Sequence, residues 1–252
     1  MITHRPSMPS FLTALAFLTR IPVRNATHTP EAIGRSAAIF PVVGALVGTV
    51  EVLVLWVCRR AMPPTLTATL IVLTGIVLTG ALHLDGLADM ADGFGGGRTR
   101  EDVLRIMRDH QIGTYGAIAL IMMLLLQISA IASLIERDAA ARFLVVAPTA
   151  SRWAMVLLGR RLPYARPDAG LGRALTDHVR DREVWESTAL ALAITAGLAR
   201  GSGIVSLALT LALTVAVGFV CWRRIGGVTG DTLGANAVLC ETIVLLAAVA
   251  QS

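Results

Sequence analysis

The chain has 252 residues, of which 55% are hydrophobic and only 15% are charged, and its mean hydropathy is +0.70. A soluble domain of this length needs more charge on its surface, so the composition excludes an ordinary soluble enzyme. All 22 basic residues are arginines, and they are spread along the chain instead of forming one basic stripe, so the net charge of +5 does not predict nucleic-acid binding.

The first predicted element is a short apolar helix near the N-terminus. Residues 9–22 contain the apolar run 11–18, which is followed by Arg20 and Pro22. This run is too short to cross a bilayer, and no small-residue cleavage site of a signal peptide follows it. We therefore expect an interfacial or re-entrant helix.

Long apolar stretches then recur along the chain. In a bilayer, each of them must pair its backbone N–H and C=O groups internally, which requires helices. The sequence thus predicts an all-α, polytopic transmembrane helical bundle of about seven spans, with a range of five to eight, as a single integral-membrane domain over residues 1–252. The predicted spans are residues 38–57, 65–82, 115–134, 143–158, 187–198, 204–221 and 235–250.

Arginine placement predicts the orientation of this bundle. With a cytoplasmic N-terminus, sixteen of the 22 arginines fall on the inside, and only Arg59, Arg60, Arg137, Arg142 and Arg200 fall outside. The protein is then a multi-pass protein of the cell inner membrane. An acidic segment, residues 83–113, and a basic loop, residues 160–186, both lie in the cytoplasm.

The acidic segment holds the main candidate site. Asp85, Asp89 and Asp92 stand at positions i, i+4 and i+7, so on a helix their carboxylates share one face. Three like charges at this spacing repel one another, and a hard divalent cation with oxygen ligands compensates them best. A solvated acidic face is the alternative, but it does not explain the glycines that crowd around the acids, such as Gly86 and Gly93. We predict that the three aspartates bind Mg²⁺.

A short amphipathic helix capped by Thr99 should follow the acids. On it, Arg105 and Arg108 can bind phosphate oxygens through their planar guanidinium groups. Alternatively, they lie on a solvated face and only hold the topology. Asp109 and His110 come directly after this helix and are candidate proton acceptors, although a histidine beside carboxylates is often a hydrogen-bonded structural partner.

A glycine-rich stretch opens the last predicted span. Glycine-rich loops that enter a helix present backbone N–H groups to phosphate, so Gly230, Gly234 and Thr232 are candidate substrate ligands and Asp231 a candidate metal ligand. Glu241 lies almost two turns inside the apolar span, where an ionisable side chain is costly and usually functional. It is a further candidate metal ligand, and an ion pair with Arg152 of the fourth span is a second hypothesis for it.

Five stretches together resemble one enzyme family. They are FLTALAFLTRIPV, FPVVGALVG, HLDGLADMADGFGGG, REDVLRIMRDHQIGTYG and GVTGDTLGANAVLCE, and they span residues 11–241 in order. This set resembles the adenosylcobinamide-GDP ribazoletransferases, also called cobalamin 5′-phosphate synthases. The resemblance implies that α-ribazole or its 5′-phosphate attacks the β-phosphorus of adenosylcobinamide-GDP and releases GMP, with Mg²⁺ as cofactor. It also implies membrane lipid around the protein.

On this resemblance, Asp85, Asp89 and Asp92 would hold Mg²⁺ against the diphosphate, with Asp89 central to the chemistry. Two alternatives stay open: a lipid enzyme similar to the CDP-alcohol phosphotransferases, and an ion-coupled transporter that uses the acids as an ion path. The sequence also leaves open whether the chain forms a homo-oligomer or associates with other corrinoid enzymes.

Overall fold

A computed structural model describes residues 8–24, 26–167, 170 and 172–252, and within them the chain is helical, with no named strand. The all-α prediction is confirmed. The helices are α1 (Met8–Leu18), α2 (Pro30–Ser36), the short 3₁₀ helix η1 (Ala37–Ile39), α3 (Phe40–Cys58), α4 (Pro64–Thr79), α5 (Leu82–Gly96), α6 (Arg100–Ile106), α7 (Thr114–Glu136), α8 (Ala140–Arg161), α9 (Arg173–His178), α10 (Asp181–Ile225) and α11 (Gly230–Gln251).

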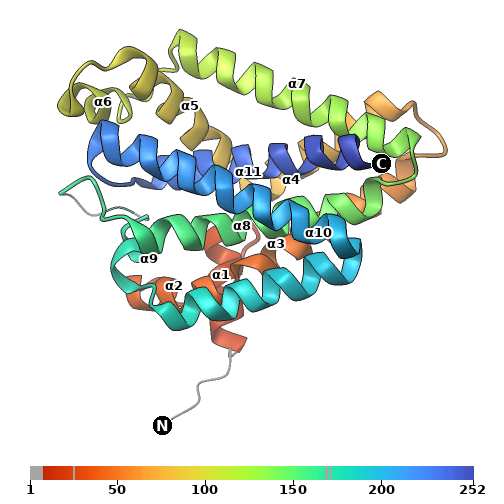
Figure 1. Cartoon of the computed structure of the whole chain (residues 1–252), viewed down its shortest axis with the longest axis horizontal. Coiled ribbons are helices and arrows are strands. Elements are labelled where there is room, and N and C mark those ends of the chain that lie inside the picture. The colour runs from red at the N-terminus through yellow and green to blue at the C-terminus, as the bar shows by residue number, and fades with distance from the viewer. Residues whose placement is uncertain (1–7, 25, 168–169, 171) are drawn as a thin grey trace.

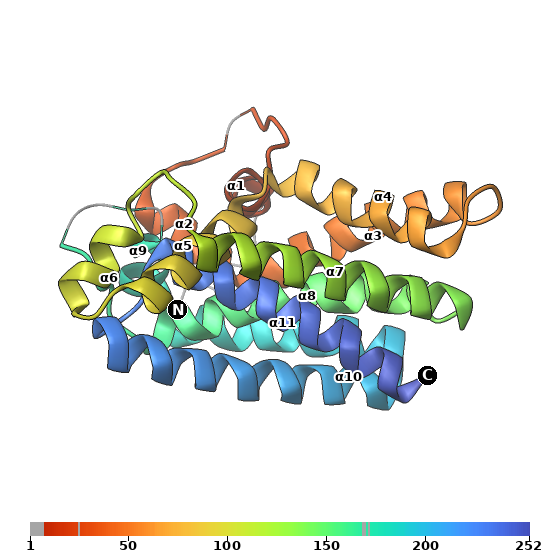
Figure 2. The same cartoon turned by 90° about the horizontal axis from the view of Figure 1, so that it is seen from above.

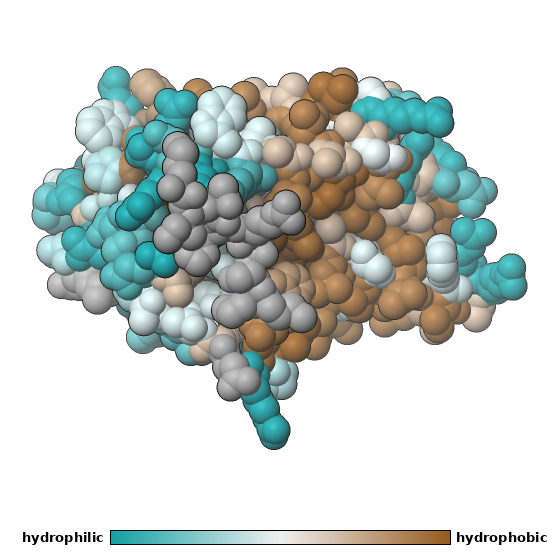
Figure 3. All heavy atoms as spheres, turned by 90° about the horizontal axis from the view of Figure 1, so that it is seen from below, coloured by the Kyte–Doolittle hydropathy of each residue, from teal (hydrophilic) through white to brown (hydrophobic). Residues whose placement is uncertain are grey.

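The long helices run roughly along one axis, and α5, α6 and α9 gather at one end of the bundle (Figure 1; Figure 2). On the face shown in Figure 3, a broad apolar zone lies between two hydrophilic ends, and most of the hydrophilic residues lie at the end that carries α6 and α9. Five helices are long and apolar enough to cross a membrane, or up to six if α4 and α5 together count as one span. The chain is therefore a membrane protein, and this number lies within the predicted range.

Helix α10 contains two of the predicted spans. Its 45 residues include Arg200, whose φ of 49° and ψ of −126° are not helical. The two halves run side by side in opposite directions, in cyan and blue (Figure 1). Gly203 lies directly against the Thr195 carbonyl across this turn. The predicted spans at residues 187–198 and 204–221 correspond to the two halves.

The second predicted span ends earlier than expected. Helix α4 stops at Thr79, and Gly80 and Ala81 both adopt left-handed backbone conformations with φ of 65° and 60°. Such a φ is strained for alanine and easy for glycine. Helix α5 therefore leaves at an angle of 91° to α4 and does not continue the span. The three aspartates lie on this departing helix, at the polar end of the bundle.

Helix α8 forms the centre of the bundle, and 78% of its apolar 18-residue stretch is buried. It packs against α3, α10 and α11. Gly44 and Gly48 of α3 lie directly against the Pro148 and Leu144 carbonyls of α8. Small residues at this four-residue spacing let membrane helices approach closely, and close packing replaces the hydrophobic effect as the force that holds them together in lipid.

Two segments outside the predicted spans also form helices. Helix α1 corresponds to the predicted N-terminal helix, and it packs into the bundle through the buried Ala14 and Leu18. Within the predicted basic loop at residues 160–186, the chain forms α9 and begins α10 at Asp181. Residues 168, 169 and 171 of that loop lie outside the described residues.

The contact between α3 and α8 can be tested with one glycine. We expect Gly48→Leu to destabilise the protein by about 1–3 kcal/mol or more, because its side chain has to displace the α8 backbone. Thermal unfolding of the purified protein in detergent measures the effect. Gly197→Leu in α10 is the matched control, since no atom lies within 4 Å of an added Cβ there. Equal melting temperatures for the two variants would contradict this packing.

Candidate functional site

The three aspartates of α5 share a helix, as predicted, but they have different surroundings. The Asp85 side chain is exposed, Asp89 is half-buried and Asp92 is buried. Among the described residues, the carboxylates of Asp85 and Asp89 make no hydrogen bond or ion pair. Asp92, by contrast, is fully engaged with backbone groups.

Asp92 binds the beginning of α7. Its two carboxylate oxygens accept hydrogen bonds from the backbone N–H groups of Gly113, at 2.7 Å, and Gly116, at 2.8 Å. A carboxylate at a helix N-terminus satisfies otherwise unpaired N–H groups and interacts favourably with the helix dipole. A Cβ at Gly113 would lie 2.5 Å from the Asp92 carboxylate, which explains the glycine at this position. Asp92 therefore joins α5 to α7 in this structure.

Helix α5 also packs tightly against the beginning of α11. A Cβ on Gly86 would lie 2.6 Å from the carbonyl oxygen of Asp231, so only glycine permits this approach. Gly234 of α11 likewise faces the His83 backbone. Two segments that lie far apart in the sequence thereby place Asp231 beside Asp85, the exposed aspartate of α5.

The predicted phosphate-binding residues of α11 have two different roles in the structure. Thr232 is fully buried and forms a capping box: the Thr229 N–H donates to the Thr232 hydroxyl oxygen at 2.8 Å, and the Thr232 N–H donates to that of Thr229 at 3.3 Å. Its side chain thus holds the helix start. Gly230 and Gly234, in contrast, line an open hollow.

Arg166 also lines the hollow, and the sequence did not single it out. Its guanidinium donates to the Asp231 carboxylate at 2.8 Å and to the Met107 carbonyl at 3.2 Å, while its buried Nε has no partner among the described residues. Arg166 lies in the connection after α8. Backbone hydrogen bonds of 2.8 and 2.9 Å fix this connection to Val228, just before α11. Nothing in the local sequence indicates that this connection reaches α5.

Two further arginines hold the α5–α6 segment in place. Arg100 donates to the carbonyls of Ile225, at 2.8 Å, and Ala165, at 2.6 Å. Arg224 donates to the carbonyls of Phe94, at 2.7 Å, and Gly97, at 2.8 Å. From the sequence, both arginines were interpreted only as residues that set the orientation of the chain in the membrane. In the structure they pair the backbone carbonyls around the acidic segment.

These elements surround a hollow of about 210 Å³ at the polar end of the bundle. Its lining includes the charged residues Asp85, Asp231 and Arg166 together with several apolar side chains. Partial burial, and then the nearby carboxylates of Asp231 and Asp85, raise the pKa of Asp89 to about 7. Arg166 lowers this pKa but does not offset the increase, so the carboxylates outweigh the positive charge around them.

This donor set fits a Mg²⁺ ion that is completed by its substrate. Among the described residues, no three acidic, histidine or cysteine side chains are close enough to enclose a metal. However, Mg²⁺ retains several waters and is usually bound by one or two carboxylates together with substrate phosphates. Asp85 and Asp89 are one helical turn apart and have no partner, which meets that requirement.

The other predicted residues of the acidic segment lie on the exposed connection between α5 and α7. As predicted, the Thr99 hydroxyl caps α6 by accepting from the Asp102 N–H at 3.1 Å. Arg105 pairs with Asp102 at 3.3 Å, and the Asp109 carboxylate accepts from the Gln111 N–H at 3.1 Å. None of Arg105, Arg108, Asp109 and His110 is among the residues that line the hollow. Their chemical roles stay predictions.

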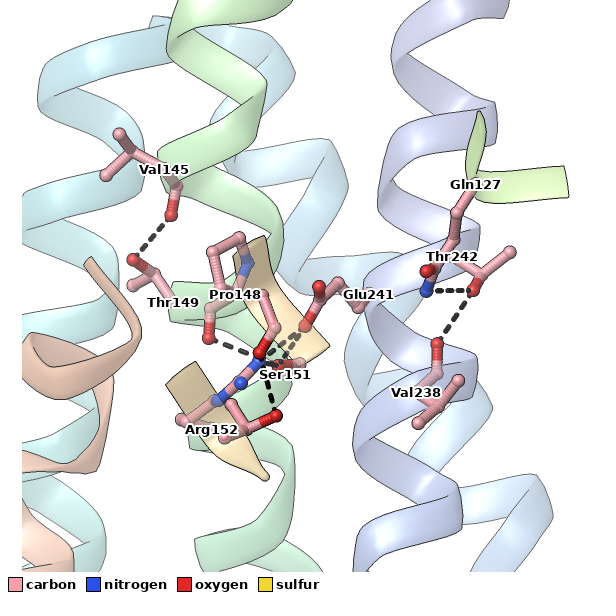
Figure 4. Close-up of polar contacts among 11 residues, drawn as sticks. Gln127, Val145, Pro148, Thr149, Ser151, Arg152, Val238, Glu241 and Thr242 are labelled. Carbon is pink, nitrogen blue, oxygen red and sulfur yellow. Dashed lines mark hydrogen bonds and ion pairs between the residues drawn. The ribbon is translucent and has the colours of Figure 1, made fainter. Parts of the chain in front are cut away.

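Glu241 lies deeper in the bundle, in a second polar region (Figure 4). The hypothesis that it pairs with Arg152 is confirmed: the Arg152 guanidinium donates to its carboxylate at 2.5 Å, and the Ser151 hydroxyl donates to the same oxygen at 3.2 Å. This pair borders a separate cavity of about 60 Å³, which Glu51 and His83 also line. A polar cavity of this size has room for a few water molecules.

The comparison with known proteins identifies the family. A family model described as cobalamin-5-phosphate synthase matches residues 10–249. The chain belongs to this family. Among its curated relatives, the adenosylcobinamide-GDP ribazoletransferase of Pseudomonas aeruginosa is 42% identical over 96% of this chain and 98% of its own length. Relatives with the same name from Syntrophobacter fumaroxidans and Chlorobaculum tepidum are 40% and 38% identical over 94% and 96% of this chain, and over 97% and 95% of their own lengths.

No solved structure matches the chain. As a member of the cobalamin-5-phosphate synthase family, the protein is a transferase of cobalamin biosynthesis in a membrane-embedded, all-helical form. The motifs that carried the resemblance include the α5 acids and the beginning of α11, which are the two segments that the fold brings together around the hollow.

Exchanging single aspartates of α5 separates structural from chemical roles. We expect Asp92→Ala to reduce the free energy of unfolding by about 1–3 kcal/mol, because the N–H groups of Gly113 and of the buried Gly116, at the start of α7, lose their acceptors. Asp85→Ala should abolish turnover and change stability by less than about 0.5 kcal/mol, since its carboxylate has no protein partner. Thermal unfolding in detergent and a turnover assay measure both effects. A loss of stability in Asp85→Ala as large as that in Asp92→Ala would contradict this assignment.

Proposed function

We propose that the protein joins α-ribazole, or its 5′-phosphate, to adenosylcobinamide-GDP in a Mg²⁺-dependent reaction that releases GMP and gives adenosylcobalamin or its 5′-phosphate. The observation that carries the proposal is the unpartnered carboxylate of Asp85, which lines the hollow together with Arg166. Asp89 is not among the lining residues, but it lies one helical turn from Asp85 and within the electrostatic influence of Asp85, Asp231 and Arg166. The names of the relatives supply the two substrate classes.

The residues of the hollow suit the charge changes of such a transfer. Phosphoryl transfer needs positioning and charge neutralisation more than covalent participation of the protein. Mg²⁺, when bound by Asp85 and Asp89, would neutralise the charge of the diphosphate. Arg166 presents a planar, permanently charged fork that can bind phosphate oxygens in two places. Asp231 holds this fork at the edge of the hollow.

The ion pair between Arg166 and Asp231 also suits a site that is empty of phosphate. Without substrate, Asp231 neutralises Arg166 and keeps it from binding other anions. When a diphosphate enters, its oxygens offer Arg166 a stronger, more highly charged partner, and Asp231 becomes available as an additional oxygen ligand. The protein thus exchanges one ion pair for another and leaves no buried charge without a partner.

The proposed orientation places this site at the cytoplasmic face of the cell inner membrane. The polar end of the bundle carries α6, α9 and the arginines around them, and arginine-rich segments stay on the cytoplasmic side. Both substrates are phosphate-bearing or polar compounds that could reach the hollow from the cytoplasm. The family model matches residues 10–249, which leaves the two alternatives, a lipid enzyme and an ion-coupled transporter, without a supporting observation.

Turnover of purified protein tests the proposal. The protein in detergent is incubated with adenosylcobinamide-GDP, α-ribazole and Mg²⁺, and GMP and the corrinoid product are quantified. We expect equal amounts of both products, a requirement for α-ribazole, and loss of activity with EDTA that is restored by Mg²⁺. GMP release that does not depend on α-ribazole would indicate hydrolysis and contradict the transfer.

The metal requirement is tested at Asp89. Asp89→Asn keeps the size and polarity of the side chain but removes its charge. We expect a loss of at least about tenfold in activity and a higher Mg²⁺ requirement, because even outer-shell changes at metal sites cost about 10–100-fold. Asp102→Asn is the matched control, since Asp102 is a carboxylate of α6 that pairs with Arg105 away from the hollow. Full activity with an unchanged Mg²⁺ requirement in Asp89→Asn would refute the role of Asp89.

A further inference from the structure

The hollow has two chemically different walls. Its charged edge, which holds Asp85, Arg166 and Asp231, has been described above. The apolar part of the lining, called the apolar wall below, includes Phe17 of α1, Met155 of α8, Leu175 of α9 and Leu233 of α11. The last three are buried, with exposed fractions of 3%, 0% and 1%, so they form the floor behind Phe17, and the half-buried Phe17 offers the accessible apolar surface.

Phe17 gives this wall an aromatic surface that is held in place. Its ring stacks on that of Phe40, with 5.6 Å between the ring centroids and 21° between the planes. Helix α1 is too short to span the membrane, and it packs against α2 and α3. The presence of α1 in the bundle therefore adds an aromatic side chain to the site, in addition to anchoring the chain.

A ligand that contacts both the charged edge and the apolar wall must have two chemically different parts. The charged edge suits phosphate or hydroxyl groups, whereas the apolar wall suits a flat, weakly polar ring system. Guanine fits this wall poorly, because its several donors and acceptors would be left unpaired against Met155, Leu175 and Leu233. A corrin is too large, since pockets for drug-sized ligands already measure about 300–1,000 Å³.

We infer that this apolar wall binds the benzimidazole-type base of the attacking riboside, with the face of the ring against Phe17. The inference rests on the proposed function and names the part of the substrate that this hollow takes. The ribose then extends from the apolar wall to the charged edge, where one of its ring hydroxyl groups, and not the 5′ oxygen that can carry a phosphate retained in the product, faces the carboxylates and Arg166. The guanosine and the corrinoid of the second substrate lie outside the hollow, so only its diphosphate reaches the charged edge.

The wild-type protein provides the first test, which does not depend on the folding of a variant. Free benzimidazole, without sugar or phosphate, is added to the turnover assay while each substrate is varied in turn. We expect benzimidazole to compete with α-ribazole but not with adenosylcobinamide-GDP. Competition with adenosylcobinamide-GDP, or no inhibition up to the solubility limit of the base, would overturn the inference.

Phe17→Ala provides the second test. We expect this substitution to raise the KM for α-ribazole about tenfold, which is the size of effect that base–aromatic stacking typically has. The KM for adenosylcobinamide-GDP and kcat should change less than about twofold. Phe11→Ala is the matched control, because Phe11 is also a half-buried phenylalanine of α1 but does not line the hollow. A shift in the KM for adenosylcobinamide-GDP, or equal effects of the two substitutions, would overturn the inference.

Direct binding separates this inference from the proposed function. Equilibrium dialysis of α-ribazole against the purified full-length protein needs no turnover and no second substrate. Saturable binding that is weakened about tenfold in Phe17→Ala and unchanged in Phe11→Ala would support the base site even if no GMP were formed. Normal turnover with no difference between these variants in α-ribazole affinity would instead refute the base site and leave the proposed transfer intact.

Discussion

The close approach of α5 to the beginning of α11 is the constraint on which the site depends. Gly86 lies against the Asp231 backbone, and Gly234 lies against that of His83. These glycines bring the carboxylates of Asp85 and Asp231, from two distant segments, to one hollow. Beside it, the pKa of Asp89 rises because the side chain is partly buried and because the nearby negative charges are only partly offset. The left-handed residues Gly80 and Ala81 make this approach possible, since they turn α5 away from the membrane span at 91°.

The ionisable groups of the bundle divide into two kinds. Asp92 and the Arg152–Glu241 pair have close partners, which is the condition for holding charge in an apolar protein at acceptable cost. Asp85 and Asp89 have none among the described residues, and Arg166 has a partner that it can exchange for phosphate. In our interpretation, the first kind stabilises the bundle and the second kind carries the chemistry. In this interpretation, aspartates that lie one or two turns apart on α5 have different functions.

Much of this organisation could be predicted from the sequence. Apolar length and helical spacing predicted the spans, the helix that carries the aspartates, the Thr99 cap and the pairing of Glu241 with Arg152. The structural role of Asp92 could not be predicted, because the spacing places three carboxylates on one face of the helix but does not show which one binds the start of α7. Arg166 was also beyond prediction, since its position depends on how the connection after α8 pairs with Val228. Both depend on tertiary contacts between segments that lie far apart in the chain.

The most direct test of the account is an experimental structure of the protein with Mg²⁺ and adenosylcobinamide-GDP. We expect a metal ion about 2.0–2.1 Å from carboxylate oxygens of Asp85 and Asp89 and in contact with the diphosphate, with Arg166 turned from Asp231 towards a phosphate oxygen. Asp92 should still bind the start of α7. A diphosphate bound elsewhere, or a metal held by Asp92 with Asp85 and Asp89 free, would contradict the account.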